Sequence, residues 1–272
     1  MFTRLLCVLS AVVLCATARG VTLDWDTATW TNNGTPPANS VHSNSYNVDP
    51  LNPGNDITVS VSGNTGLLQY GTPAIATTFG GGLTPVAPAT GTNSLVLGVD
   101  FTNQSQVITV TVDFSALYAQ GVQNVSFTIF DVDFDNTNGS NGSRYQDQLR
   151  AISAIGMDGS AIAPTITTSA NNTLSGTTGL GQVVNGMTST VDSGAGSGNA
   201  NVTISFGTAS IRSFTFSYGS GSATANDPTY QHIGLHDISF TPVPEINPAW
   251  TAMLSCLAAG ALVLRHRANF RK

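Results

Sequence analysis

The sequence predicts an all-β fold, and more specifically one antiparallel β-sandwich of jelly-roll type over residues 21–241. Residues 57–61 (ITVSV) and 107–114 (VITVTVDF) alternate apolar and polar side chains, as half-buried strands do. Strand-like segments recur at intervals of about ten to fifteen residues, which favours a sandwich or barrel over alternating strands and helices. No segment of this region keeps the 3.6-residue apolar period of a helix.

Each expected strand is a short run rich in β-branched and aromatic residues between turn-forming residues. The expected strands, in chain order, are residues 21–25, 57–61, 94–101, 107–114, 124–135, 148–156, 162–166, 182–184, 201–206, 211–218 and 232–240. We expect residues 201–206 and 211–218 to form a hairpin. Residues 115–120 are the one place where a helical turn would fit.

The segment 124–135 changes its alternation partway along. Val125, Phe127 and Ile129 share one face of a strand, whereas the apolar residues from Phe130 onward share the other. Because side chains alternate with a period of two, either a bulge intervenes or the chain leaves the sheet here.

Charge and cysteine content exclude some functions for residues 21–241, which we call the body. The body holds three arginines, fourteen aspartates, no lysine and no glutamate, so its net charge is −11, against −6 for the whole chain. Such a surface repels phosphate backbones, so we expect no nucleic-acid partner. Cys7, Cys15 and Cys256 all lie outside the body, which therefore has no disulfide framework and no cysteine metal site.

The N-terminal residues 1–18 have the features of a secretory signal peptide. Arg4 precedes the short apolar run 5–14, and Ala16-Thr17-Ala18 matches the small-residue cleavage pattern. The alternative is an uncleaved N-terminal anchor, but the apolar run is too short to span a bilayer comfortably.

The C-terminal segment 242–272 combines a short motif, an apolar run and a basic tail. A helix over residues 246–264, which contain no charge, would just span a hydrocarbon core of roughly 30 Å. The basic tail 265–272 fits a cytoplasmic end, so we expect the body outside the cytoplasm and the tail inside. A buried core helix is the alternative, and the flanking prolines and basic residues argue against it. The basic residues of the tail are Arg265, Arg267, Arg271 and Lys272.

This segment resembles the PEP-CTERM sorting signal of Gram-negative bacteria, which joins a Val-Pro-Glu-Pro motif to a transmembrane helix and an arginine cluster. Val243-Pro244-Glu245 matches the motif, and Ile246 stands where the second proline is usual. The resemblance implies export, membrane retention, and processing near the motif by an exosortase, an integral membrane cysteine protease–transpeptidase. Release or attachment to surface material would follow. In that case the protein is a substrate, and Val243, Pro244 and Glu245 are its recognition residues.

Within the body, the best candidate for a metal site is an acidic stretch. Asp131, Asp133 and Asp135 alternate with apolar residues, and Asp147 follows a polar loop. Clustered carboxylate oxygens suit Ca²⁺, which would here be structural. The stretch lacks the glycine and glutamate of an EF-hand, and the alternative is a solvated acidic loop with Asx turns.

The other candidate residues point away from catalysis. His232 and His236 would lie about 13 Å apart on a strand, so we expect no zinc site. No G-x-S-x-G motif is present, and no carboxylate pair of a glycosidase can be chosen from sequence. Aromatic residues that could stack on sugars, unless they pack in the core, are Trp25, Trp30, Tyr46, Tyr70, Tyr145 and Tyr230.

These features favour a non-enzymatic protein of the cell surface or extracellular matrix. It would be exported, anchored by its C-terminal helix and sorted through its motif. One alternative is a carbohydrate-binding module that engages exopolysaccharide, and a further alternative is a secreted hydrolase.

Overall fold

The computed structural model describes residues 19–31, 40–76, 92–135, 144–189, 198–228 and 231–244. All of them except Arg19 and Pro244 belong to one compact unit, Gly20–Val243. The second unit comprises Met1–Arg19 and Pro244–Lys272. The expected signal peptide, membrane segment and basic tail lie outside the described residues. Within the described residues, no helix is long and apolar enough to cross a membrane.

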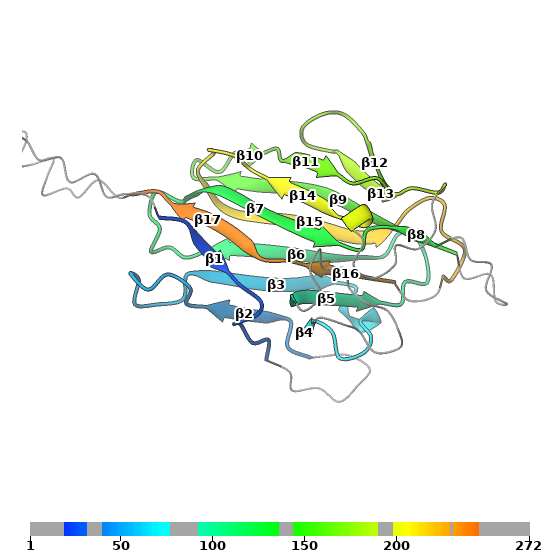
Figure 1. Cartoon of the computed structure of the whole chain (residues 1–272), viewed down its shortest axis with the longest axis horizontal. Coiled ribbons are helices and arrows are strands. Elements are labelled where there is room, and N and C mark those ends of the chain that lie inside the picture. Colours follow the sequence, from blue (N-terminus) through cyan, green and yellow to red (C-terminus); the bar gives the residue numbers. More distant parts are fainter. Residues whose placement is uncertain are drawn as a thin grey trace, which may run out of the picture. The chain divides into compact units, whose positions relative to one another are not determined.

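The described part of the unit is built from antiparallel strands and two short 3-10 turns, which confirms the all-β prediction (Figure 1). The strands are β1 (Val21–Leu23), β2 (Ser43–Tyr46), β3 (Ile57–Gly63), β4 (Ala74–Ala76), β5 (Ser94–Val99), β6 (Val107–Phe114), β7 (Val122–Phe130), β8 (Phe134–Asp135), β9 (Tyr145–Gly156), β10 (Ala161–Ile162), β11 (Thr165–Thr168), β12 (Asn172–Ser175), β13 (Val183–Gly186), β14 (Val202–Ser205), β15 (Ile211–Ser220), β16 (Gln231–Leu235) and β17 (Ile238–Pro242). The 3-10 turns are η1 (Thr65–Leu67) and η2 (Gly198–Ala200).

The strands pair in two rows. In the first row, β2, β3, β6, β15 and β9 follow one another, and β9 also pairs with β8, β10 and β13. In the second row, β7 pairs with β14 on one side and with β16 and β17 on the other. Strands β11, β5 and β1 extend this row. A pairing between Ile211 and Val122 joins the rows into one curled sheet.

Aromatic side chains from both rows meet in the hydrophobic core. Phe127 of β7 stacks on Phe214 of β15 with ring centroids 4.5 Å apart, and Phe114 of β6 packs on Phe240 of β17 at 5.0 Å. These rings are almost completely withdrawn from solvent, so the rows are held together mainly by apolar burial.

The outward side of the first row is lined by hydroxyl groups. Directly paired residues of antiparallel strands point to the same face, and the register therefore aligns Ser43, Ser60, Thr111, Thr215 and Ser153 across β2, β3, β6, β15 and β9. Two parallel lines are Ser45–Thr58–Asp113–Ser213 and Ser62–Thr109–Ser217. Ser213 and Ser217, on the central strand β15, are buried, and Ser217 pairs with Arg150 of β9.

Two local expectations meet different outcomes. The change of alternation within residues 124–135 marks the point where the chain leaves the sheet, because β7 ends at Phe130 and Asp131 follows with a φ of 66°. The hairpin expected from residues 201–206 and 211–218 does not form. Strand β14 pairs with β7 and β11, whereas β15 pairs with β6 and β9, so the intervening residues carry the chain from one row to the other.

Candidate functional site

The predicted acidic residues lie where the chain crosses from β7 to β9. After Phe130 the chain passes through Asp131 to Asp133 and reaches β8, which pairs with the start of β9. The crossing fits closely against β13: a Cβ added to Gly186 would lie 1.9 Å from the carbonyl oxygen of Asp133. Residue 186 must therefore be glycine for the backbones to approach this closely.

Asp147 is held in the interior by donors from two directions. Its Oδ1 accepts a hydrogen bond of 2.6 Å from the hydroxyl of Tyr218, and its Oδ2 accepts one of 3.2 Å from the backbone N–H of Asp133. The N–H of Asp147 in turn donates to the Asp133 carbonyl at 2.8 Å. Burial, followed by the charge of Asp147, raises the pKa of Tyr218 well above its ordinary value, so the phenol stays protonated and donates.

Asp131 pairs with a histidine from the second row. Its Oδ2 lies 3.0 Å from Nε2 of His232 on β16, and both side chains are buried. The sequence offered no signal for this pair, because the two residues lie 101 positions apart and belong to segments with no shared local pattern. His236, the other histidine of that region, lies 3.7 Å from Asp237 at the surface.

The structure thus brings together three of the four predicted metal ligands at one crossing. Asp131, Asp133 and Asp147 are buried, whereas Asp135 is half-buried on β8 opposite Tyr145. The oxygens of Asp147 and Oδ2 of Asp131 face protein groups. In the described part of the chain, no group of three or more histidine, cysteine or acidic side chains is arranged as metal ligands. A calcium site at these residues therefore stays a prediction.

The sorting motif begins at the end of the folded unit. Strand β17 ends at Pro242, and the N–H of Val243 donates to the carbonyl of Gly121 at 3.0 Å. Pro244 is exposed. Glu245 lies outside the described residues, as do Arg265, Arg267, Arg271 and Lys272.

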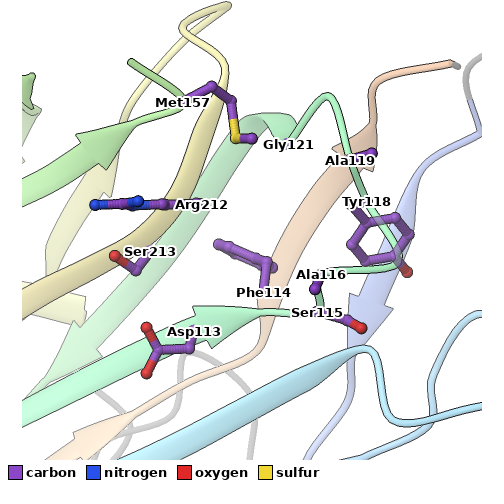
Figure 2. A pocket seen from close by; sticks show the side chains of 10 residues that line it. All are labelled: Asp113, Phe114, Ser115, Ala116, Tyr118, Ala119, Gly121, Met157, Arg212 and Ser213. Carbon is purple, nitrogen blue, oxygen red and sulfur yellow. The ribbon is translucent and has the colours of Figure 1, made fainter. Parts of the chain in front are cut away.

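A pocket of about 380 Å³, which no sequence pattern predicted, lies at one end of β6 and β15. In Figure 2, Arg212, Ser213 and Asp113 line one side, Ser115 and neighbouring residues line the other, and Phe114 lies between them. Burial raises the pKa of Asp113, and the nearby charge of Arg212 partly offsets that effect. The full lining is Asp113, Phe114, Ser115, Ala116, Tyr118, Ala119, Gly121, Met157, Arg212 and Ser213.

The aromatic residues considered for sugar stacking lie mostly inside the fold. Trp25, Trp30 and Tyr145 are buried, and Tyr46 is half-buried with its ring against Trp25 at 5.7 Å. Tyr70 is 43% exposed, and Tyr230 lies outside the described residues. Stacking platforms are therefore scarce on the described surface.

Comparisons of the chain with protein-family models, with curated proteins and with solved structures found no match.

Proposed function

We propose that the protein is an exported, non-enzymatic protein of the cell surface or extracellular matrix. In this proposal, residues 246–264 anchor it in the membrane, and an exosortase recognises Val243, Pro244 and Glu245. The supporting observation is that the compact unit ends at Val243, directly before the rest of the motif. A processing enzyme needs an accessible segment. Pro244 is exposed, and of the motif only Val243, which is half-buried and bonded to Gly121, would have to detach from the body.

The second part of the proposal concerns the fold of the body and what stabilises it. We propose that its curled sheet is a sandwich of jelly-roll type, which is supported by two rows of antiparallel strands that share one aromatic core. No cysteine lies within the body, so packing and sheet hydrogen bonds hold it together. A structural Ca²⁺ at Asp131, Asp133, Asp135 and Asp147 is part of this proposal. Its support is the burial of three of these carboxylates at one crossing.

Processing can be tested in a bacterium that encodes an exosortase. The tagged full-length chain is expressed as the parent, as Pro244→Ala/Glu245→Ala, and as the control Pro248→Ala, which changes a proline just beyond the motif. We expect the parent and the control to lose a C-terminal fragment, as seen by mass spectrometry of the mature protein. The double variant should accumulate uncut in the membrane fraction.

The sorting proposal fails if the parent stays full-length in the presence of the exosortase. It also fails if the double variant is cut as efficiently as the control, since recognition would then not involve the motif.

A further inference from the structure

Three of the six large hydrophobic side chains that are exposed on the described surface lie at one end of the body. The six are Leu51, Tyr70, Leu117, Met157, Leu174 and Leu180. Met157 follows the last residue of β9, and its sulfur would lie 2.8 Å from a Cβ added to Gly121 (Figure 2). Leu117 belongs to the turn after β6, and its Cδ1 would lie 3.3 Å from a Cβ added to Gly54. Leu51, which is 74% exposed, lies with Gly54 in the loop between β2 and β3. We call Leu51, Leu117 and Met157 the apolar tips.

The chain leaves the body at this same end. The N–H of Val243 donates to the carbonyl of Gly121 at 3.0 Å, and Gly121 is the neighbour of Met157. Two residues then separate Val243 from the proposed anchor, residues 246–264. Because an extended chain advances at most about 3.6 Å per residue, the first residue of the anchor can lie no more than about 11 Å from Val243. An anchor that spans a bilayer would therefore hold the apolar tips close to the lipid surface.

We propose that the apolar tips enter the surface of the membrane that holds the anchor, so that this end of the body binds the lipid bilayer. This inference rests on the proposed anchor and goes beyond it, because it assigns a lipid-binding surface to the body. The short connection selects the bilayer as the partner, since it brings these side chains to lipid before any other molecule has to be recruited. Exposed leucine and methionine side chains gain free energy when they leave water for the boundary between headgroups and acyl chains.

The charged groups at this end suit a zwitterionic headgroup. Arg212 lines the pocket there, and a guanidinium can pair with a phosphate oxygen. Asp113 lines the same pocket, and the exposed Asp158 follows Met157, so both signs of charge are present. A strongly anionic membrane would instead repel the body, whose net charge is −11.

The contact needs little affinity of its own. Because the anchor keeps the body at the membrane, binding of the tips to lipid is intramolecular, and a weak attraction is enough to keep it formed. Three side chains can therefore fix the orientation of the anchored body, although they would bind a free protein to vesicles only weakly.

The test measures whether lipid reaches residue 117. The full-length chain is exported by a bacterium without an exosortase, which keeps the C-terminal segment, and is reconstituted into phosphatidylcholine vesicles. Its three cysteines, Cys7, Cys15 and Cys256, are replaced by serine, and Leu117→Cys carries a fluorescent label. Nitroxide groups near the headgroup end of the acyl chains should quench this label by about half or more, because apolar groups of interfacial segments lie roughly 5–10 Å deep in that region.

The matched position is Leu174→Cys, which labels another exposed leucine. Leu174 is 40% exposed, against 49% for Leu117. The strand register places Leu174 level with Ile108, near the start of β6, whereas Leu117 follows Phe114 at the end of β6. Those two β6 residues lie about 20 Å apart along the strand. The label at residue 174 should therefore keep its emission.

A pair of charge variants tests the apolar tips themselves. With the label at residue 117, Leu51→Asp/Met157→Asp should reduce quenching at least about threefold, because a carboxylate is costly to move out of water. The control Leu174→Asp/Leu180→Asp makes the same change at two other exposed side chains and should be quenched like the parent. All four side chains are exposed, and circular dichroism checks that each variant folds.

Anchoring is measured separately, by flotation of the vesicles after an alkaline carbonate wash. The parent should float, and Leu254→Asp/Leu257→Asp, which places charges in the proposed anchor, should not. A parent that does not float, or a variant that floats equally, overturns the anchor and this inference together.

Two further results would overturn the lipid contact alone. In the first, the chain floats but the label at residue 117 is quenched no more than the label at residue 174; shielding of residue 117 from a water-soluble quencher would then show that a second copy of the chain covers the tips. In the second, the two aspartate variants are quenched equally, so that the tips do not make the contact.

Discussion

At the scale of single residues, the interior of this protein is unusual for its buried carboxylates. Moving a carboxylate out of water is costly unless it accepts hydrogen bonds or pairs with a cation. Asp147 meets this requirement with Tyr218 and the Asp133 backbone, and Oδ2 of Asp131 lies 3.0 Å from Nε2 of His232. Removing one of these donors should therefore lower the free energy of unfolding more than removing an exposed polar group of the same type.

Tyr218→Phe tests the Asp147 network. The change leaves Oδ1 of Asp147 without its phenol donor and should lower the free energy of unfolding by about 1–3 kcal/mol at pH 7. Because the pKa of Tyr218 is raised in the folded state, its contribution to stability is fully present below about pH 10, the ordinary phenol pKa, and is lost as the pH rises further. Urea unfolding at pH 7 and pH 11 should show a smaller alkaline loss for the variant. The control is Tyr70→Phe, on a ring that is 43% exposed; equal midpoints for both variants would contradict the expectation.

Calcium binding belongs to the same crossing. If Asp131, Asp133, Asp135 and Asp147 hold Ca²⁺, a chelator should lower the melting temperature of the parent by roughly 5 °C or more, because a ligand that binds only the folded state stabilises it. The variant Asp133→Ala should melt at the same temperature with and without chelator. A parent whose melting temperature ignores the chelator has no stabilising calcium there.

At the scale of strands, alternation predicted β3 and β6 well because each faces the core on one side and solvent on the other. The change of alternation within residues 124–135 also coincides with the end of β7 at Phe130. Alternation could not predict which strands pair, since β14 and β15 are close in sequence yet lie in different rows. The Asp131–His232 pair and the pocket could not be predicted from the sequence for the same reason. Both form where strands distant in the chain come together, and local sequence patterns do not predict long-range contacts.

Strand β15 is central to the core, which makes Phe214 its most informative position. Its ring contacts Phe127, Phe114 and Phe206, at centroid distances of 4.5, 6.2 and 5.8 Å. Phe214→Ala should therefore cost about 3–5 kcal/mol in the free energy of unfolding, because it leaves a cavity between the rows. Urea titration measures the loss, and Leu117→Ala, at a side chain 49% exposed, should change stability by less than about 1 kcal/mol. Similar losses for both variants would mean that the rows do not depend on this contact.

At the scale of the whole molecule, the body combines a large negative charge with three aspartates whose pKa values are raised. Burial is the main cause that raises the pKa of Asp100, Asp113 and Asp237. A raised carboxyl pKa contributes stability that is complete below the ordinary value of about 4 and is lost as the pH rises through the folded-state pKa. Self-repulsion among fourteen aspartates and three arginines acts in the same direction.

The folded protein should therefore become more stable when the pH falls from about 6 to about 4, toward the ordinary carboxyl pKa. The urea midpoint should rise over this interval, and added salt should raise it more at the upper end than at the lower end, because screening relieves repulsion that protonation has not yet removed. Asp158, whose pKa is lowered by hydrogen bonds from Ser160, acts in the opposite direction, but it is fully exposed and outnumbered by the three raised groups. Asp113→Asn should reduce the slope of midpoint against pH, whereas Asp158→Asn should not. A midpoint that falls steadily over the same interval would show that other carboxylates, stabilised in their charged form, dominate the stability of the molecule.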